Sequence, residues 1–217
     1  MALQLKICGL TEPAQAASVA QLGADAIGVI AVERSPRHLD LSQRPALWDA
    51  VATASPSTLR VLVVVNPSDA ELAQLDGCHG HQVVQLHGEE SPERCRQLRD
   101  QLKLPLWKAL RIRSADDLQA ASHYSNCVDG LLLDAWSAGA HGGTGQQLPL
   151  QLLQGFTPQL PWWLAGGISP TTAASVLEQL QALNLSPCGL DASSGVETTP
   201  GRKDLQQVAA LMAAVKG

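Results

Sequence analysis

The chain has 217 residues, of which 45% are hydrophobic and 16% are charged, and its formal net charge at pH 7 is −5. This composition is typical of a folded globular protein and excludes extensive disorder. The mild acidity disfavours binding to nucleic acid or to an anionic membrane, because both partners require a basic surface. A small anionic substrate remains possible, since backbone N–H groups can hold it.

Cysteine usage and the start of the chain point to the cytoplasm. The five cysteines are odd in number, lie far apart and include no Cys-x-x-Cys motif, which is typical of a reducing compartment. No basic segment followed by an apolar stretch opens the chain, and no apolar run approaches the about 20 residues that span a bilayer. We therefore expect a cytoplasmic protein with neither a signal peptide nor a membrane span.

Short apolar runs alternate with amphipathic stretches along the chain. The predicted strands are 3–8, 26–30, 59–65, 82–86, 105–110, 130–133, 162–165 and 189–192, and several are apolar throughout, as strands covered on both faces are. The predicted helices are 12–22, 42–52, 68–75, 91–102, 114–121, 171–183 and 203–216, with a short one near 148–153.

This alternation predicts an α/β fold, a single (β/α)8 TIM barrel that occupies residues 1–217 as one domain. An open doubly wound sheet is the alternative, but such a sheet carries its phosphate-binding glycines after the first strand. Here the glycine-rich segments follow the last two predicted strands, which favours the barrel. A barrel of this kind places its catalytic groups at the carboxyl ends of the strands.

The first and sixth strands end in groups that can move a proton. Because side chains alternate along a strand, Cys8 shares a face with Lys6 and points into the barrel mouth if Ile7 packs against helices. The thiol can act as a base if a cation such as Lys6 favours the thiolate. The alternative is an inert buried cysteine beside a lysine that is paired with a carboxylate such as Asp191. Asp134 closes an apolar run and is the best general-acid candidate, with a loop or helix cap as the alternative.

Two further strand ends present polar side chains. Arg37 follows Ser35-Pro36, and a guanidinium on such a rigid turn suits a carboxylate or phosphate, with a solvated loop arginine as the alternative. His87 follows the fourth strand on the same face as Gln85. We expect it to line the pocket unless it is purely structural.

Glycine-rich segments indicate a phosphate site. Gly166-Gly167 follows the seventh strand and Ser193-Ser194-Gly195 follows the eighth, and the N–H groups of such loops can hold phosphate. Gly142-Gly143-Thr144-Gly145 after the sixth strand indicates a loop that closes over the substrate. The six histidines are dispersed, and neither a metal-ligand motif nor a nucleotide-binding glycine loop is present, so we expect no metal and no cofactor.

Taken together, these motifs resemble the phosphoribosylanthranilate isomerase family of tryptophan biosynthesis. The matching segments are Lys6-Ile7-Cys8-Gly9-Leu10-Thr11, Ser35-Pro36-Arg37, Val84-Gln85-Leu86-His87-Gly88, Leu133-Asp134, Gly142-Gly143-Thr144-Gly145, Leu164-Ala165-Gly166-Gly167 and residues 191–204. The chain departs from the family at Ala31, where phenylalanine is frequent, and at Gln146-Gln147, where basic and aromatic residues are frequent.

The resemblance implies an Amadori rearrangement, in which N-(5-phosphoribosyl)anthranilate becomes 1-(2-carboxyphenylamino)-1-deoxyribulose 5-phosphate. It implies Cys8 as the general base, Asp134 as the general acid and Arg37 as the partner of the anthranilate carboxylate. It also implies that the backbone of Gly167, Ser194 and Gly195 binds the phosphate. We expect a monomer or homodimer whose partner is this small phosphorylated molecule.

Three other interpretations stay open. The related aminoaldose isomerase of histidine biosynthesis resembles a two-fold repeat with an aspartate at the end of the first strand, so Cys8 disfavours it. Indole-glycerol-phosphate synthase is another phosphosugar barrel. A non-catalytic barrel that binds a phosphorylated ligand is the alternative from a different class, and the presence of both Cys8 and Asp134 speaks against it.

Overall fold

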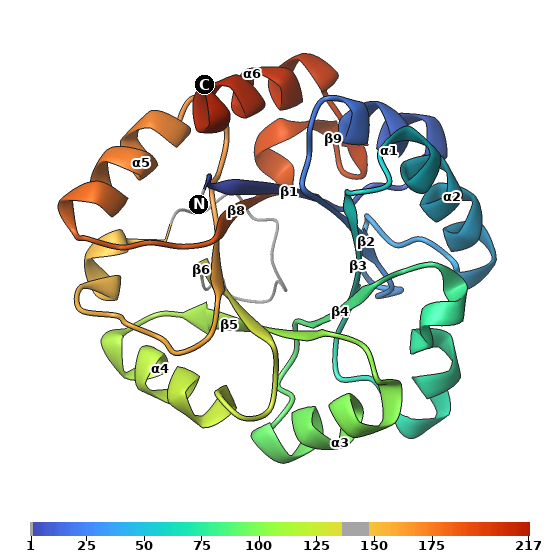
Figure 1. Cartoon of the computed structure of the whole chain (residues 1–217), viewed down its shortest axis with the longest axis horizontal. Coiled ribbons are helices and arrows are strands. Elements are labelled where there is room, and N and C mark those ends of the chain that lie inside the picture. The colour runs from blue at the N-terminus through green and yellow to red at the C-terminus, as the bar shows by residue number, and fades with distance from the viewer. Residues whose placement is uncertain (1, 136–147) are drawn as a thin grey trace.

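A closed barrel of eight parallel strands forms the centre of the computed structural model, which describes residues 2–135 and 148–217. The strands follow chain order around the ring, and β8 pairs with β1 to close it (Figure 1). Their bounds are β1 Gln4–Cys8, β2 Ala26–Ile30, β3 Leu59–Val64, β4 Val83–Leu86, β5 Leu106–Ile112, β6 Gly130–Ala135, β7 Trp162–Ala165 and β8 Gly189–Ala192. The predicted TIM barrel is confirmed.

Helices surround the ring on its outside, as Figure 1 shows. The α-helices are α1 Pro13–Gln21, α2 Arg44–Ala54, α3 Pro92–Leu102, α4 Ala115–Gln119, α5 Ala173–Ala182 and α6 Leu205–Lys216. The 3-10 helices are η1 Leu41–Gln43, η2 Asp69–Leu75, η3 Gly77–His79, η4 Ala120–Tyr124, η5 Leu150–Leu153 and η6 Ser194–Val196. Local sequence sets several starts. Pro92 opens α3, and the Ser91 hydroxyl accepts a hydrogen bond from the Arg94 N–H at 3.2 Å.

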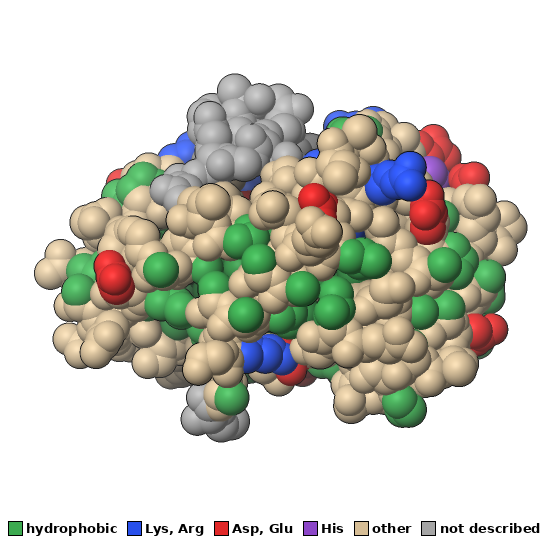
Figure 2. All heavy atoms as spheres, turned by 90° about the horizontal axis from the view of Figure 1, so that it is seen from above, with side chains coloured by type: hydrophobic (Ala, Val, Ile, Leu, Met, Phe, Trp, Pro, Cys, Tyr) green, Lys and Arg blue, Asp and Glu red, His purple; other side chains and the backbone are tan. Residues whose placement is uncertain are grey.

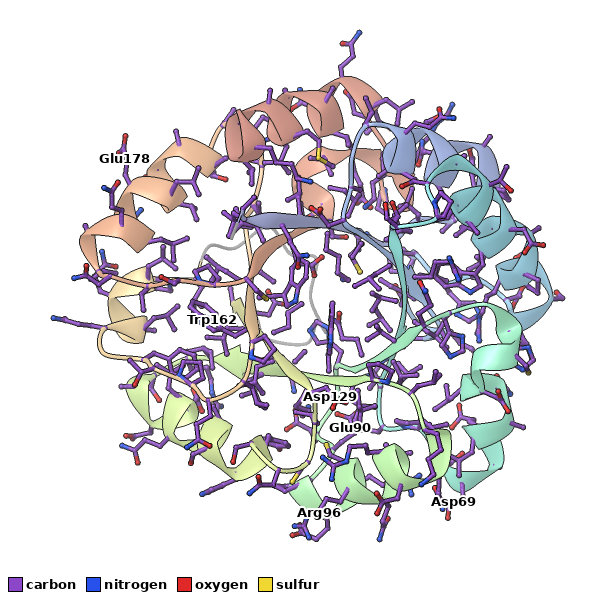
Figure 3. All side chains as sticks on the ribbon, in the orientation of Figure 1. Asp69, Glu90, Arg96, Asp129, Trp162 and Glu178 are labelled. Atoms are coloured by element: carbon purple, nitrogen blue, oxygen red, sulfur yellow. The ribbon has the colours of Figure 1, made fainter. Side chains whose placement is uncertain are left out.

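Alternation along the strands divides the buried side chains into two cores. Outward side chains such as Leu5, Ile7 and Leu133 join the large core between the barrel and its helices. Trp162 of β7 belongs to this outer core and lies outside the ring in Figure 3. Inward side chains form a smaller core inside the barrel, made of Ala26, Val61, Val83, Trp107, Ala109, Leu132, Trp163 and Ala165. Whether a strand side chain faces the helices or the barrel interior therefore follows from the core to which its neighbours belong.

Two tryptophans fill much of the barrel interior. The ring centroids of Trp107 and Trp163 are 5.2 Å apart with the planes tilted by 32°. Glycines on the neighbouring strands leave the space. A Cβ atom at Gly130 would lie 3.1 Å from Trp107, and one at Gly189 would lie 2.3 Å from Trp163. The interior is thus packed, and ligands can be received only at an end of the barrel.

A buried ion pair lies between the barrel and its helices. The Lys108 ammonium is 2.9 Å from the Glu90 carboxylate, and both side chains are almost fully buried. Glu90 lies between the barrel wall and α3 in Figure 3. Lys108 also donates to the Gly88 carbonyl at 2.7 Å, and Glu90 accepts from the Gly88 and Asn66 N–H groups, so the pair fixes the start of the segment between β4 and α3.

Several predicted helices were only partly right. Residues 69–75 form the 3-10 helix η2 rather than an α-helix, although Ser68 and Glu71 form a capping box at its start. The predicted helix 203–216 begins later, at Leu205, because Asp204 caps it and Arg202–Lys203 (β10) pairs instead with Glu197–Thr199 (β9). The short helix expected near 148–153 is the 3-10 helix η5.

Acidic and basic side chains are scattered among one another on the face shown in Figure 2. Among the described residues, no helix combines the length and the apolarity that crossing a bilayer requires.

Candidate active site

Cys8 ends β1 with its side chain inside the barrel. Its neighbour Ile7 belongs to the outer core, so the alternating Cys8 and Lys6 side chains both face inward. Gly28 of the adjacent strand makes room for them. A Cβ atom at residue 28 would lie 2.6 Å from the Cys8 sulfur and 3.1 Å from the Lys6 nitrogen. The thiol and the ammonium therefore share the space that this missing side chain leaves.

Lys6 forms a buried ion pair across the junction of β1 and β8. Its Nζ atom is 2.9 Å from Asp191 Oδ1, and Lys6 is fully buried. Burial alone would lower the pKa of Lys6, but the charge of Asp191 and the nearby Cys8 raise it, so Lys6 remains a cation. The structure shows the pairing with Asp191 that the sequence suggested as one interpretation, and it also places the ammonium beside the thiol.

The Cys8 thiol is held between opposing influences. Burial raises its pKa, and the charge of Asp191 adds to that rise, whereas Lys6 and Lys203 act to lower it. The net direction is upward, so the free protein keeps Cys8 mostly as the thiol near neutral pH. A base in this position gains strength, since a thiolate with a raised pKa binds a proton more tightly.

Asp134 lies inside the barrel near the carboxyl end of β6. Leu131 and Leu133 face the outer core and Leu132 the inner one, so Asp134 faces inward with Leu132. Its Oδ2 atom is 3.4 Å from Nε2 of His87, and both side chains are buried. Asp191 is in electrostatic range of Asp134 and His87 as well as of Lys6. Asp191 therefore interacts electrostatically with both the Cys8 thiol and the Asp134 carboxyl.

One ring nitrogen of His87 lacks a hydrogen-bond partner among the described residues. Gln85 Nε2 lies 3.2 Å from His87 Nδ1, which fixes the orientation of the imidazole ring. Within the described residues, His87 Nε2 and Gln85 Oε1 are buried and have no hydrogen-bond partner. Buried polar atoms are normally satisfied, so Gln85 Oε1 is available to a ligand or to water. His87 Nε2 lies 3.4 Å from Asp134 Oδ2 without a hydrogen bond to it, and can pair with that carboxylate or with a ligand.

Arg37 is fixed by a residue far along the chain. The Glu197 carboxylate accepts from Arg37 Nε at 2.9 Å and from Nη2 at 2.7 Å. Lys203 Nζ binds the same carboxylate at 2.6 Å and donates to the Ser193 carbonyl at 3.2 Å. Gly9 makes this approach possible, because a Cβ atom there would lie 2.6 Å from Arg37 Cδ. The edge of the guanidinium that does not face Glu197 can still bind a planar anion.

The loops after β7 and β8 pack tightly against each other. Gly166 and Gly167 have φ angles of 93° and 68°, which glycine adopts without strain. A Cβ atom at Gly195 would lie 2.1 Å from the Ile168 carbonyl oxygen. Ser194 and Gly195 open the short helix η6, where the first N–H groups have no partner within the helix. The Ser193 hydroxyl donates to the Cys8 carbonyl at 3.0 Å and joins this loop to β1.

The structure brings the predicted residues to one end of the barrel, since each follows or ends a strand at its carboxyl side. Gly142-Gly143-Thr144-Gly145 and Gln146-Gln147 lie outside the described residues. Sequence reasoning missed Gly28, Lys203 and the role of Glu197 as the support of Arg37. The period-two alternation of β2 could have identified Gly28, but nothing local indicates that Glu197 meets Arg37.

Comparisons with known proteins agree on one family. The family model for N-(5'phosphoribosyl)anthranilate (PRA) isomerase matches residues 5–214. The N-(5'-phosphoribosyl)anthranilate isomerase of Synechococcus elongatus is 45% identical over 216 residues, which cover 99% of this chain and 97% of the relative.

Solved structures are similar over the whole chain. The dimeric phosphoribosylanthranilate isomerase of Thermotoga maritima, solved as generated monomers, is 26% identical with a TM-score of 0.81 and 99% of each chain covered. A phosphoribosyl anthranilate isomerase in complex with reduced 1-(o-carboxyphenylamino)-1-deoxyribulose 5-phosphate is also 26% identical, with a TM-score of 0.82 and 99% of each chain covered.

Proposed function

The chain belongs to the N-(5'-phosphoribosyl)anthranilate isomerase family of tryptophan biosynthesis, and on that premise we propose how its residues divide the work. The reaction turns an aminoaldose into an aminoketose, so it needs an acid at the sugar ring oxygen and a base at carbon 2. The observation that supports the assignment is that Cys8 and Asp134 both face the barrel interior at its carboxyl end. Asp191 interacts electrostatically with both of them.

Asp134 acts as the general acid. It gives a proton to the ring oxygen while the bond from that oxygen to carbon 1 breaks, and the nitrogen lone pair forms the iminium. His87 is 3.4 Å from the Asp134 carboxyl, and its free Nε2 edge lines the same space. We assign His87 the role of orienting this carboxyl and contacting the substrate.

Cys8 acts as the general base. The thiolate removes the proton from carbon 2, which the adjacent iminium has acidified, and the released electron pair forms the double bond of an enolamine. Loss of the proton of the 2-hydroxyl and protonation of carbon 1 then give the ketone. Acid and base catalysis of this kind contribute about 10²–10⁴-fold each.

The anionic ends of the substrate have separate partners. The free edge of Arg37 faces the anthranilate carboxylate, and a bidentate contact there fixes the aromatic end. The backbone N–H groups of Gly167, Ser194 and Gly195 receive the phosphate. The close packing of these two loops, which Gly195 permits, supports one continuous cradle.

We infer further that one barrel domain spans residues 1–217 and works in the cytoplasm as a monomer or homodimer. The T. maritima relative is described as dimeric. Light scattering of the purified protein measures its oligomeric state directly.

The activity is tested by turnover of N-(5'-phosphoribosyl)anthranilate with the purified protein, together with growth of a tryptophan auxotroph that lacks this isomerase. We expect the wild-type chain to restore growth and to form the aminoketose, and Cys8→Ala and Asp134→Asn to fail in both. A folded wild-type protein without turnover would refute the activity. Normal turnover in either variant would remove only that residue from the mechanism.

A further inference from the structure

A ladder of buried charges runs below Cys8. Lys6 lies two residues before Cys8 on the same inward face of β1, and Asp191 of β8 pairs in register with Lys6. The Lys6 ammonium is 2.9 Å from the Asp191 carboxylate and lies with the Cys8 sulfur over Gly28. The cation thus pairs with the carboxylate and shares with the thiol the space over Gly28.

Among residues 2–135 and 148–217, charged groups from three elements act on this thiol. On its own strand the charged neighbour is Lys6. From β8 it faces Asp191, and from β10 it faces Lys203, whose main partner is Glu197. The adjacent strand β2 presents Gly28, which carries no side chain. Asp191 in turn faces Asp134 and His87.

We propose that Lys6 is a positioning residue that favours ionisation of Cys8 to the thiolate, and that Asp191 disfavours this ionisation. The ion pair that they form then sets how readily Cys8 ionises. This proposal deepens the proposed function and rests on it for its catalytic meaning. Lys6 stabilises the thiolate by charge, whereas Asp191 repels the thiolate and also neutralises Lys6. The two members of one ion pair therefore act on the thiol with opposite signs.

The opposite signs separate this proposal from a purely structural role. Lys6 and Asp191 also join β1 to β8, and loss of either partner of a buried pair destabilises a protein. A structural role predicts that both single variants lose stability and leave the ionisation of Cys8 alone. The proposal predicts that one variant makes the thiolate harder to form and the other makes it easier.

The experiment measures the pH dependence of alkylation of the free enzyme by iodoacetamide, with the Cys8 peptide quantified by mass spectrometry. The midpoint of the rate against pH reports the pKa of the thiol and does not depend on its accessibility. Exposed Cys78 serves as an internal reference in the same sample. Burial raises the pKa of Cys95 to about 12 and that of Cys188 to about 11, so neither competes near neutrality.

We expect Lys6→Met to move the Cys8 midpoint up and to slow its alkylation at neutral pH by at least about tenfold, the equivalent of one pKa unit. Asp191→Asn moves the midpoint down and speeds alkylation. The double variant Lys6→Met/Asp191→Asn lies between the two. Lys6→Arg keeps the cation, so its Cys8 midpoint should stay close to that of the wild type. If Lys6→Met does not fold, Lys6→Arg and Asp191→Asn are compared instead.

Lys108→Met is the matched control. It breaks a buried lysine–carboxylate pair of the same kind, but Lys108 faces outward from β5 and pairs with Glu90. We expect it to lose stability and leave the Cys8 midpoint unchanged. An unchanged midpoint in both Lys6→Met and Asp191→Asn, or shifts of the same sign, would overturn the proposal.

The same measurement is independent of the assigned mechanism. If Cys8→Ala retains turnover, Cys8 is not the base, yet the midpoints of the Lys6 and Asp191 variants still test the control of its ionisation. If Cys8→Ala abolishes turnover and the midpoints do not move, the base is correct and its control lies elsewhere.

Discussion

Glu197 and Arg37 are 160 residues apart in the chain, yet the Glu197 carboxylate accepts hydrogen bonds from two nitrogens of the Arg37 guanidinium, Nε at 2.9 Å and Nη2 at 2.7 Å. Lys203 binds the same carboxylate at 2.6 Å. A side chain with many rotamers is thereby fixed in one orientation before any ligand arrives, which lowers the entropic cost of binding a planar anion.

The first prediction concerns this orientation. Glu197→Gln should raise KM by about tenfold while kcat changes less, because the loss of a charged partner frees Arg37 directly but reaches Cys8 only through Lys203. Steady-state kinetics over a range of substrate concentrations checks this. Glu93→Gln, which disrupts an exposed contact to Arg96, serves as the control and should leave both constants unchanged. A fall in kcat alone would contradict the positioning role.

The second prediction concerns the two proton-transfer groups. Cys8→Ala and Asp134→Asn should each lower kcat by at least about 10²-fold while melting as single cooperative transitions, because each removes one proton-transfer group and little volume. His87→Asn should have a smaller effect, since its proposed role is to orient Asp134. An effect of His87→Asn larger than that of Asp134→Asn would exchange their roles.

The third prediction concerns the phosphate cradle. Gly195→Ala places a methyl group 2.1 Å from the Ile168 carbonyl, so the two loops must separate. We expect a higher KM and weaker inhibition by inorganic phosphate, together with a loss of about 1–3 kcal/mol in stability. Gly23→Ala is the control, because Gly23 has a positive φ but open space around it. Equal phosphate inhibition in wild type and Gly195→Ala would refute the cradle.

The fourth prediction concerns acid stability. Burial would raise the pKa of Glu197, but the hydrogen bonds from Arg37 and the charge of Lys203 hold it below its ordinary value of 4.5. A carboxyl with a lowered pKa in the folded state stabilises the fold above 4.5, and this contribution is lost as the pH falls below that value.

Glu197→Gln should therefore be less stable than wild type at neutral pH, and the difference should shrink below pH 4.5. Urea unfolding at several pH values measures both free energies. A difference that stays constant with pH would show that the glutamine loses packing rather than charge.

The fifth prediction concerns the barrel interior. Gly189→Ala brings a methyl group within 2.3 Å of the Trp163 ring, and such overpacking costs about 1–3 kcal/mol. In a Trp163→Leu background the same glycine change should cost less, because the ring it strikes is gone. Thermal unfolding of the four proteins gives the coupling free energy. A coupling of zero would mean that the ring moves aside freely.

Strands were predicted more accurately than helices, for a physical reason. Residues 26–30 and 162–165 are apolar runs bounded by loops, and the structure has strands at those bounds. Residues 189–192 also form a strand at the predicted bounds, although Asp191 lies within it. β5 continues to Ile112, two residues beyond its predicted end, because Arg111 interrupts the apolar run while still pairing with β6. Because most strands are buried on both faces, their interiors are apolar and can be predicted from the sequence. A polar residue near the barrel mouth makes the end of a strand harder to predict.

The site was predictable only where local pattern decides it. Alternation in β1 and the end of the apolar run in β6 indicated Cys8 and Asp134, and glycine pairs indicated the last two loops. The support of Arg37 by Glu197 depends on how β9 and β10 fold back, and these strands are too short to show a period. Pro200-Gly201, with Gly201 at a φ of 85°, was the available sign of a turn.

The junction of β1 and β8 has a consequence for biogenesis. Ser193 leaves the ribosome 185 residues after Cys8, together with its neighbours Asp191 and Gly195. A nascent polypeptide that has not yet reached β8 has the Cys8 thiol and Lys6, but neither Asp191, which pairs with Lys6, nor the loop that contains Ser193 and Gly195. If these groups act as proposed, we expect turnover to be gained only when the ring is completed, so that recovery of activity during refolding reports the time of that closure.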